Sequence, residues 1–254
     1  MLLFVVVGVT QLGDVVYVVC RLSSVIRRFS ATTHQRLTDI VAVDLSDPWD
    51  IAACERMSQL YVADWAKCVW RVSPDGDDIQ RWLPNSLSDT YRPSTLSVTS
   101  SRLLVTSLDK HLIHLDAGGD ELRRVPLPDY ITDYPHHAVE SPSGTFVVCH
   151  RNTQLGQDQV SEVNIKGQVL RQFSGSHGLP EHIAADWHGN VFVTDWQYRH
   201  ILLLDAKLAL RRVIIDEHQL NYRPPFRLCY MEQSGQLLVG LDDINVAVFD
   251  VLRR

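Results

Sequence analysis

The sequence predicts an all-β fold, a six-bladed β-propeller, and three observations lead to it. Five prolines recur at intervals of 45, 42, 45 and 45 residues, at Pro48, Pro93, Pro135, Pro180 and Pro225. Each of them opens the same phrase of short apolar, β-type runs separated by turn residues. No stretch shows a convincing helical period. A period of this size along the whole chain indicates one supersecondary unit copied end to end.

The copies correspond position by position. An apolar residue follows three positions after every proline, as at Ile51 and Ile183, and a second apolar run such as Phe192-Val193-Thr194 comes next. The opening copy has no proline but contains similar runs, including Val16-Tyr17-Val18-Val19. The predicted units of this single domain, 1–254, are residues 3–47, 48–92, 93–134, 135–179, 180–224 and 225–254.

The middle runs of each unit favour a propeller over a linear solenoid. Runs such as Leu103-Leu104-Val105 and Ile201-Leu202-Leu203-Leu204 are apolar at successive positions, so both faces of the sheet must be buried. A blade between two neighbouring blades meets that condition. A solenoid would need polar capping units, and neither end of the sequence resembles one.

The opening stretch Met1–Val9 is apolar, and we expect it to form a strand of the first blade. It has no basic lead and no small-residue cleavage site, which a signal peptide would need. A membrane span requires ~18 apolar residues, so we expect no membrane association. The five cysteines are an odd number and lie in or beside apolar runs, which favours reduced thiols and a cytoplasmic location.

The phrase Pro-x-x-Ile-Ala, followed by Gly and then by aromatic-Val-x-Asp, resembles the NHL repeat. The best copy is Pro180–Asp195 and the next best is Pro48–Asp64. The resemblance implies a six-bladed propeller similar to the C-terminal NHL domains of tripartite-motif proteins and to a peptidyl-hydroxyglycine lyase. The chain departs from the family at Tyr198 and His200, where NHL repeats usually have Asn and Arg.

Asp-Trp dipeptides at Asp64-Trp65 and Asp195-Trp196 invite comparison with WD repeats, but the match is poor. These dipeptides follow the second strand, whereas the WD dipeptide closes the third. We expect Asp64 and Asp195 to accept hydrogen bonds from turn amides at the strand ends.

The loops that lead into each first strand and those that join second to third strands should gather on one face around the axis, here called the loop face. Aromatic residues and arginine, which are typical interface anchors, are abundant there. The alternative for Trp49, Trp65 and Phe226 is that they fill gaps between blades. The candidate binding residues are Trp49, Trp65, Lys67, His137, His150, His182, Trp196, Tyr198, Arg199, Phe226 and Arg227, with Lys110, His136, Arg151 and Glu181 on the same face.

We therefore expect a non-catalytic platform that binds a protein or peptide, with no cofactor. The alternative is a metal-dependent hydrolase or lyase around His137 and His182, which both stand two residues after a proline and should approach the axis. No nucleophile, phosphate-loop or dinucleotide motif supports catalysis. RNA binding is a further alternative, disfavoured by the net charge of −6 and by paired arginines that fall in outer strands, not in the loops.

The last unit is predicted to lack its fourth strand, since it stops after Phe249–Arg254. Propellers of this kind usually take that strand from residues ahead of the first blade, and Met1 leaves almost no chain there. Asn245–Val251 would then be an exposed edge able to accept a partner's strand or to self-associate. The alternative is that Met1 is not the native start and that a longer protein continues upstream.

Overall fold

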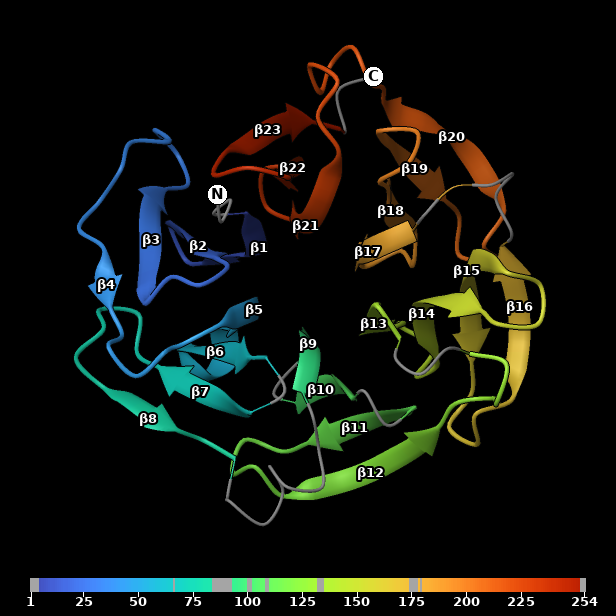
Figure 1. Ribbon diagram of the computed structural model, residues 1–254, viewed down its shortest axis with the longest axis horizontal. Helices are drawn as coiled ribbons and strands as arrows, with labels where there is room; N and C mark the ends of the chain where they lie inside the picture. Colours follow the sequence, from blue (N-terminus) through green and yellow to red (C-terminus); the bar gives the residue numbers. More distant parts are fainter. Residues whose placement is uncertain are drawn as a thin grey trace.

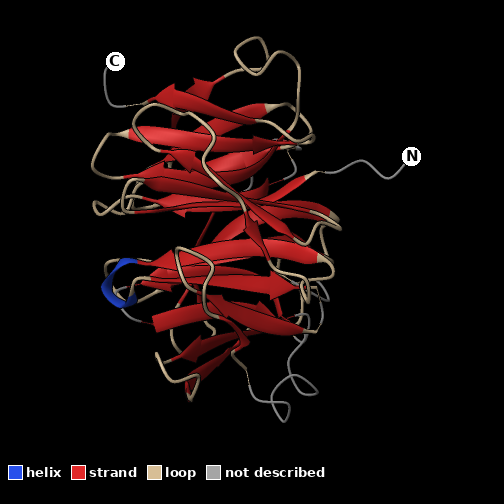
Figure 2. Ribbon diagram, turned by 90° about the vertical axis from the view of Figure 1, so that its left-hand side faces the viewer, coloured by secondary structure: helices blue, strands red, loops and turns tan. Residues whose placement is uncertain are grey.

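The computed structural model of the chain describes residues 5–65, 67–83, 93–99, 102–107, 110–131, 135–173, 178 and 180–251. Within these residues, six antiparallel sheets stand around a common axis as the blades of a propeller (Figure 1). Helical structure in the described residues is limited to a 3-10 turn at Glu55–Met57 (Figure 2), and none of it could span a membrane. The predicted all-β, six-bladed propeller is confirmed.

In each blade the strands follow one another outward from the axis in chain order. Blade one contains β1 (Val6–Leu12), β2 (Val15–Cys20), β3 (Val25–Ser30) and β4 (Ile40–Val41), and blade two contains β5 (Pro48–Cys54), β6 (Gln59–Asp64), β7 (Cys68–Val72) and β8 (Ile79–Arg81). Blade three contains β9 (Pro93–Thr99), β10 (Arg102–Ser107), β11 (His111–Leu115) and β12 (Glu121–Pro126), and blade four contains β13 (His137–Glu140), β14 (Phe146–Asn152), β15 (Gln157–Val163) and β16 (Val169–Phe173). Blade five contains β17 (Pro180–Ala185), β18 (Val191–Asp195), β19 (His200–Leu204) and β20 (Leu210–Ile215), and blade six contains β21 (Pro225–Met231), β22 (Gln236–Leu241) and β23 (Val246–Asp250).

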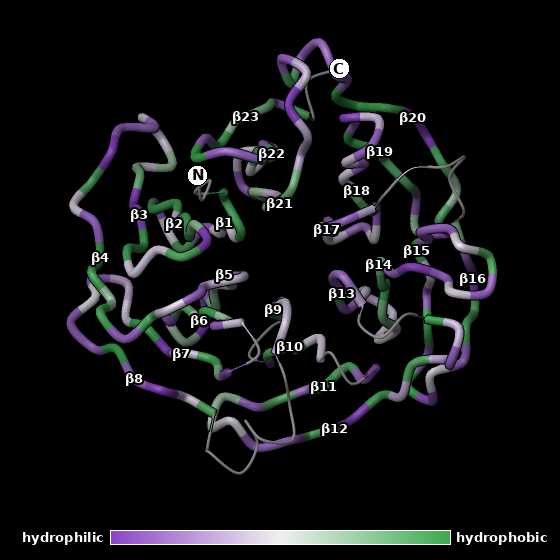
Figure 3. Tube along the Cα trace, viewed as in Figure 1, coloured by the Kyte–Doolittle hydropathy of each residue, from purple (hydrophilic) through white to green (hydrophobic). Residues whose placement is uncertain are grey.

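The hydrophobic core lies between adjacent blades. Strand β18 is buried at every position, because each of its faces packs on a neighbouring blade. The third and fourth strands become progressively more exposed, and hydrophilic residues dominate the outer rim, for instance in the loop between β3 and β4 (Figure 3). The successive apolar positions seen in the sequence thus correspond to blades covered on both faces. Four of the five free cysteines are buried within this core.

Fourth strands are mostly solvated but insert an apolar anchor toward the next blade. In β12 only Val125 is buried, and it packs in one cluster with Ala138 and Phe146 of blade four. At the end of β20, Ile215 packs with Leu228 and Leu237 of blade six. Blade six has three strands in the described residues, as predicted, so this outer anchor has no counterpart there.

Five of the six first strands begin with a register shift, at the residues that follow Val6, Pro48, Pro93, Pro180 and Pro225. A β-bulge changes the direction of the side chains that follow it. In blade one the residue after the bulge is Gly8, and a β-carbon at this position would lie 2.6 Å from the amide nitrogen of Ile51. Glycine is therefore required for β1 to approach β5 so closely.

We expect Gly8→Ala to lower the free energy of unfolding by about 1–3 kcal/mol, because the added methyl group would overlap the backbone of blade two and the Val19 side chain. The measurement is the urea midpoint followed by tryptophan fluorescence. Gly118→Ala is the matched control, since its β-carbon would meet only carboxylate oxygens, of Asp116 at 3.2 Å and of Asp120 at 3.9 Å, and no backbone atom. Equal midpoints for the two variants would contradict the close approach.

Candidate functional site

One residue of each first strand faces the axis, and in five of the six blades it follows or lies within the register shift at the start of the strand. These residues, here called the axial ring, stand two positions after Val6 or after the repeated proline: Gly8, Asp50, Thr95, His137, His182 and Arg227. Threonines of the second strands hold two of them in place. Thr106 Oγ1 accepts the amide of Thr95 at 2.9 Å, and Thr194 Oγ1 accepts the amide of His182 at 2.8 Å.

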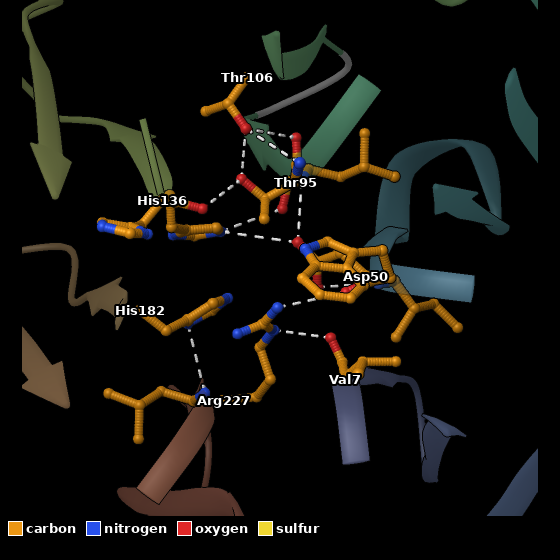
Figure 4. A network of polar contacts seen from close by, with 12 residues as sticks. Val7, Asp50, Thr95, Thr106, His136, His182 and Arg227 are labelled. Atoms are coloured by element: carbon orange, nitrogen blue, oxygen red, sulfur yellow. Dashed lines mark hydrogen bonds and ion pairs between the residues drawn. The ribbon is translucent and has the colours of Figure 1, made fainter. Parts of the chain in front are cut away.

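Hydrogen bonds from the axial ring connect several of the blades to their neighbours. The amide of Leu96 donates to Asp50 Oδ2 at 2.8 Å, and the amide of Leu228 donates to His182 Nδ1 at 3.3 Å. Thr95 Oγ1 donates to the carbonyl of His136 at 3.0 Å (Figure 4). The ring side chains thus satisfy backbone groups of the adjacent first strand that would otherwise be buried without partners.

Arg227 spans the junction between blade six and blades one and two (Figure 4). Its Nε donates to the carbonyl of Val7 at 2.6 Å, and its Nη2 donates to the carbonyl of Trp49 at 3.4 Å. Nη1 donates to the carbonyl of Phe226 at 3.0 Å. Only 3% of Arg227 is exposed, so one cation occupies the enclosed centre of the ring.

Burial controls the electrostatics of this centre. Removal from water raises the pKa of Asp50 to about 7, although the Arg227 charge and the amides of Leu96 and Ile51 act in the opposite direction. The same removal from water lowers the pKa of Arg227, which the Asp50 carboxylate partly offsets. Each of these two buried groups therefore favours the charged form of the other.

The two axial histidines are neutral. Burial lowers the pKa of His137 to about 3 and lowers the pKa of His182 well below the ordinary histidine value, with the nearby Arg227 charge acting in the same direction. Their rings stack with centroids 3.7 Å apart, an arrangement that two imidazolium ions would not adopt. This contact links blades four and five.

Asp50, His137 and His182 are the residues that could hold a metal, because one potential ligand atom of each lies within 4.8 Å of the others. Some of these ligand atoms already accept backbone hydrogen bonds, however. Both Asp50 oxygens accept backbone amides, and His182 Nδ1 accepts the Leu228 amide. A cation at this point would also face the Arg227 guanidinium. The arrangement therefore serves blade closure better than metal coordination.

A recess of about 180 Å³ lies beneath the ring, on the side where the first strands end. Its walls are mainly apolar first-strand residues, among them Ala52, Val98 and Ala184, with Asp50, His137 and His182 among its lining residues. Thr10, Ser97 and Cys229 also line this recess.

The predicted loop-face residues of blade two form a compact aromatic group. Trp49 and Trp65 are half-buried with ring centroids 4.3 Å apart, and the Arg21 guanidinium lies 5.0 Å from the Trp49 ring. Lys67 is exposed in the same turn. Phe226 packs against the core between blades one and two, so it fills a gap, as the alternative prediction proposed.

The equivalent turn of blade five carries the most exposed aromatic residues of the predicted set. Trp196 is 40% exposed and Tyr198 is 42% exposed. Asp195, buried at the strand end, accepts the Tyr198 amide at 3.0 Å, and Arg199 follows with a positive φ of 56°. The expected capping role of Asp195 is confirmed, and so is that of Asp64, whose Oδ1 accepts the amide of Asp47 at 2.8 Å.

His150 lies away from the axial ring. It is fully buried in β14, and its Nε2 is 2.7 Å from Ser161 Oγ within the same blade. Burial lowers its pKa to about 4.

The structure also assigns structural roles to residues absent from the predicted set, namely Asp50, Thr95 and Arg21. Asp50 and Thr95 could have been found from the position that they share with His137 and Arg227, whereas nothing in the sequence connected Arg21 with Trp49.

No family model and no curated protein matches this sequence. The fold, by contrast, is similar to many solved structures. One is the WD40 propeller domain of Doa1, with TM-score 0.72, 14% identity and coverage of 98% of this chain and 94% of that chain. Another belongs to the nidogen/laminin complex, with TM-score 0.67, 17% identity and coverage of 85% and 82%. Virginiamycin B lyase from Staphylococcus aureus has TM-score 0.68, 14% identity and coverage of 96% and 79%. Such low identities establish the propeller fold alone.

We expect Arg227→Met to lower the free energy of unfolding by about 3–5 kcal/mol, because it removes the bonds to the buried carbonyls of Val7 and Trp49 and takes away a charge that favours the ionised form of buried Asp50. Urea denaturation measures the change. Adding Asp50→Asn to Arg227→Met should recover part of the loss. Arg211→Met is the control, since Arg211 forms an exposed pair with Asp205 and should cost less than about 1 kcal/mol. A similar small cost for Arg227→Met would contradict its role.

Acidification should destabilise the protein through the buried histidines. Between pH 6.5 and about 3 the unfolded chain binds a proton that folded His137 does not, so stability falls as pH drops; His182 and His150 act in the same direction. Asp50 acts oppositely, because its folded pKa of about 7 exceeds the unfolded value of 3.8, and stability rises as pH falls between them. Three histidines against one carboxyl give a net loss.

His182→Asn keeps an acceptor for the Leu228 amide but cannot titrate, so it should flatten the fall in urea midpoint between pH 7 and pH 4.5. The exposed residue His34 provides the control variant His34→Asn, which should follow the wild-type curve. An unchanged slope in His182→Asn would show that this histidine is not neutral in the folded protein.

Proposed function

We propose that this propeller is a non-catalytic recognition platform that binds a protein or peptide through its loop face. The observation that carries the proposal is the exposure of Trp196 and Tyr198 in one turn, with the Trp49–Trp65 pair in the equivalent turn region of blade two. Large aromatic side chains that stay partly exposed on a rigid support are typical anchors of protein interfaces.

Neighbouring residues hold the Tyr198 and Trp49 side chains in place in the unbound protein. Asp195 holds the Tyr198 amide, and the Tyr198 ring stacks near His200 with centroids 6.2 Å apart. Arg21 covers Trp49 and pairs with Asp47 at 3.7 Å. Preorganised aromatic residues lose little conformational entropy on binding, which favours affinity.

The comparisons support this proposal only at the level of the fold, since one similar structure is a chain of the nidogen/laminin complex. The Pro-x-x-Ile-Ala phrases further support a divergent NHL-type propeller, related to those of tripartite-motif proteins. The odd number of cysteines supports a cytoplasmic location, which is also part of the proposal. The hydrolase or lyase alternative is opposed by Arg227 and by the hydrogen bonds that occupy Asp50 and His182. The RNA alternative is opposed by the net charge of −6.

The test selects peptides from a random display library on the immobilised protein and measures their affinity by calorimetry. Trp196→Ala and Tyr198→Ala should each weaken binding of the selected peptides by at least about tenfold, as expected for anchor residues. Trp187→Ala is the matched control, because Trp187 is 72% exposed in the turn between β17 and β18, at the opposite end of the blade.

Equal affinity in all variants, or a loss only with Trp187→Ala, would contradict the assignment to the loop face. Binding of mixed RNA that weakens steeply with added salt would favour the RNA alternative instead.

A further inference from the structure

We propose that the outer edge of β23 binds an extended segment of a partner protein, which adds a fourth strand to the three that blade six has in the described residues. This site lies on the outer side of the blade, away from the loop-face aromatics, so the proposal goes beyond the recognition function proposed above. Strand addition to an open sheet edge is a general mode of peptide recognition, in which main-chain hydrogen bonds give affinity and side-chain pockets give specificity.

The register of β23 shows which groups are available. Its inner bonds to β22 involve Asn245, Ala247, Phe249 and Val251, because Leu241 pairs with Asn245 and Gly235 with Val251. In an antiparallel pair the intervening residues point their amides and carbonyls the other way. Val246, Val248 and Asp250 therefore present an unpaired ladder on the outer edge of the sheet, as far as the described residues extend.

Two grooves flank this edge. The first, about 570 Å³, runs between β20 and β23 and is lined by residues 212–216, Gln219 and residues 248–251. The second, about 200 Å³, lies between blades six and one, where Val246, Val248 and Leu238 face Val16, Val18 and Phe29. The first groove combines apolar residues with the charged side chains of Arg212, Asp216 and Asp250, and the second is smaller and largely apolar.

The complete blades show what occupies the corresponding space. A fourth strand there inserts an apolar anchor between its own blade and the next, as Val125 does toward blade four and Ile215 toward blade six. The apolar groove between blades six and one is the place that such an anchor would fill. Because Val246, Val248 and Phe29 around it remain partly exposed, burying an apolar side chain against them is favourable.

The chemistry of the occupant follows from the chain's own fourth strands. Two of them share the phrase Leu-Arg-Arg-Val, at Leu122–Val125 and Leu210–Val213. Their basic residues pair with carboxylates of the same blade: Arg211 lies 2.9 Å from Asp205, and in blade four Arg171 lies 2.7 Å from Glu162. Asp250 ends the third strand of blade six, whereas Asp205 comes directly after β19; Asp250 is exposed, and its Oδ1 accepts a hydrogen bond from Gln236.

The occupant is therefore an extended segment in which apolar residues flank one or two arginines, with an apolar anchor for the groove between blades six and one. The edge itself carries neither lysine nor proline, and its outward residues include two valines. Edge strands that must avoid pairing usually contain lysine or proline, so the absence of both residue types from β23 makes this edge suited to pairing.

A fluorescent peptide with the sequence of residues 207–217, which contains Leu-Arg-Arg-Val-Ile-Ile, serves as the probe, and anisotropy measures its binding to the whole chain. We expect saturable binding at micromolar concentration. A peptide with proline in place of its Val213 should bind at least about tenfold more weakly, since proline removes a ladder donor. A peptide with both arginines replaced by glutamate should also bind more weakly because of Asp250.

On the protein, Val248→Pro removes one outward amide, and proline is tolerated on edge strands where the amide points outward. It should abolish peptide binding while the urea midpoint shows that the fold is retained. Val43→Pro is the matched control, because Val43 is 80% exposed in the turn closed by the Leu45 amide and the Ala42 carbonyl, and it should bind as the wild type does. Trp196→Ala should also leave this binding unchanged, which separates the edge from the loop face.

Absence of binding at millimolar peptide, or equal binding of the wild-type and proline-containing peptides, would overturn the proposal; the peptide comparison holds even if Val248→Pro fails to fold. Sedimentation provides a further check. A dimer of the chain that Val248→Pro dissociates would also overturn it, because the edge would then belong to a second copy of this protein.

Discussion

The bonds from Arg227 to the carbonyls of Val7 and Trp49 are the contacts on which the ring most depends. Blade six has three strands in the described residues, so no strand shared with blade one closes the circle. Closure falls on Arg227, on an apolar cluster in which Val6 and Val16 of blade one pack with Leu238 of blade six, and on backbone contacts such as the amide of Val6 with the carbonyl of Asp243 at 2.7 Å. At the next junction, Gly8 lets β1 lie close against blade two.

Because the side chains at the axis bond neighbouring blades to one another, they are less available for metal binding or catalysis. The Asp50 carboxylate and the His182 imidazole, which could coordinate a metal, accept backbone amides of the neighbouring blades, His137 Nε2 lies 3.2 Å from the Leu96 carbonyl, and a buried guanidinium lies nearby. A buried network of this kind is stabilising only while every member keeps its partner. Catalysis at the axis would require these groups to exchange partners, so recognition is better supported by surfaces that the closure does not need.

The loop face and the edge of β23 are two such surfaces, and they would bind a partner through different interactions. The loop face offers exposed aromatic side chains held by turns, and binding there would depend on side-chain burial. The edge of β23 offers main-chain donors and acceptors beside an apolar groove, and binding there would depend on strand pairing. Because the two sites involve different blades and different groups, a partner could occupy either one without competing for the other.

The sequence alone determined the propeller, because a repeat of turn signals and doubly buried apolar runs is compatible with few architectures, and it also predicted the open sixth blade. It placed His137 and His182 at the axis, since both occupy the same position in the repeat. Only the tertiary structure decided what they do there. The bonds of Asp50 to Leu96 and of Arg227 to Val7 join residues 46 and 220 positions apart. The neutral charge of the axial histidines and the hydrogen bonds of their ring nitrogens follow from such long-range contacts and from burial. Local sequence carries no record of such contacts.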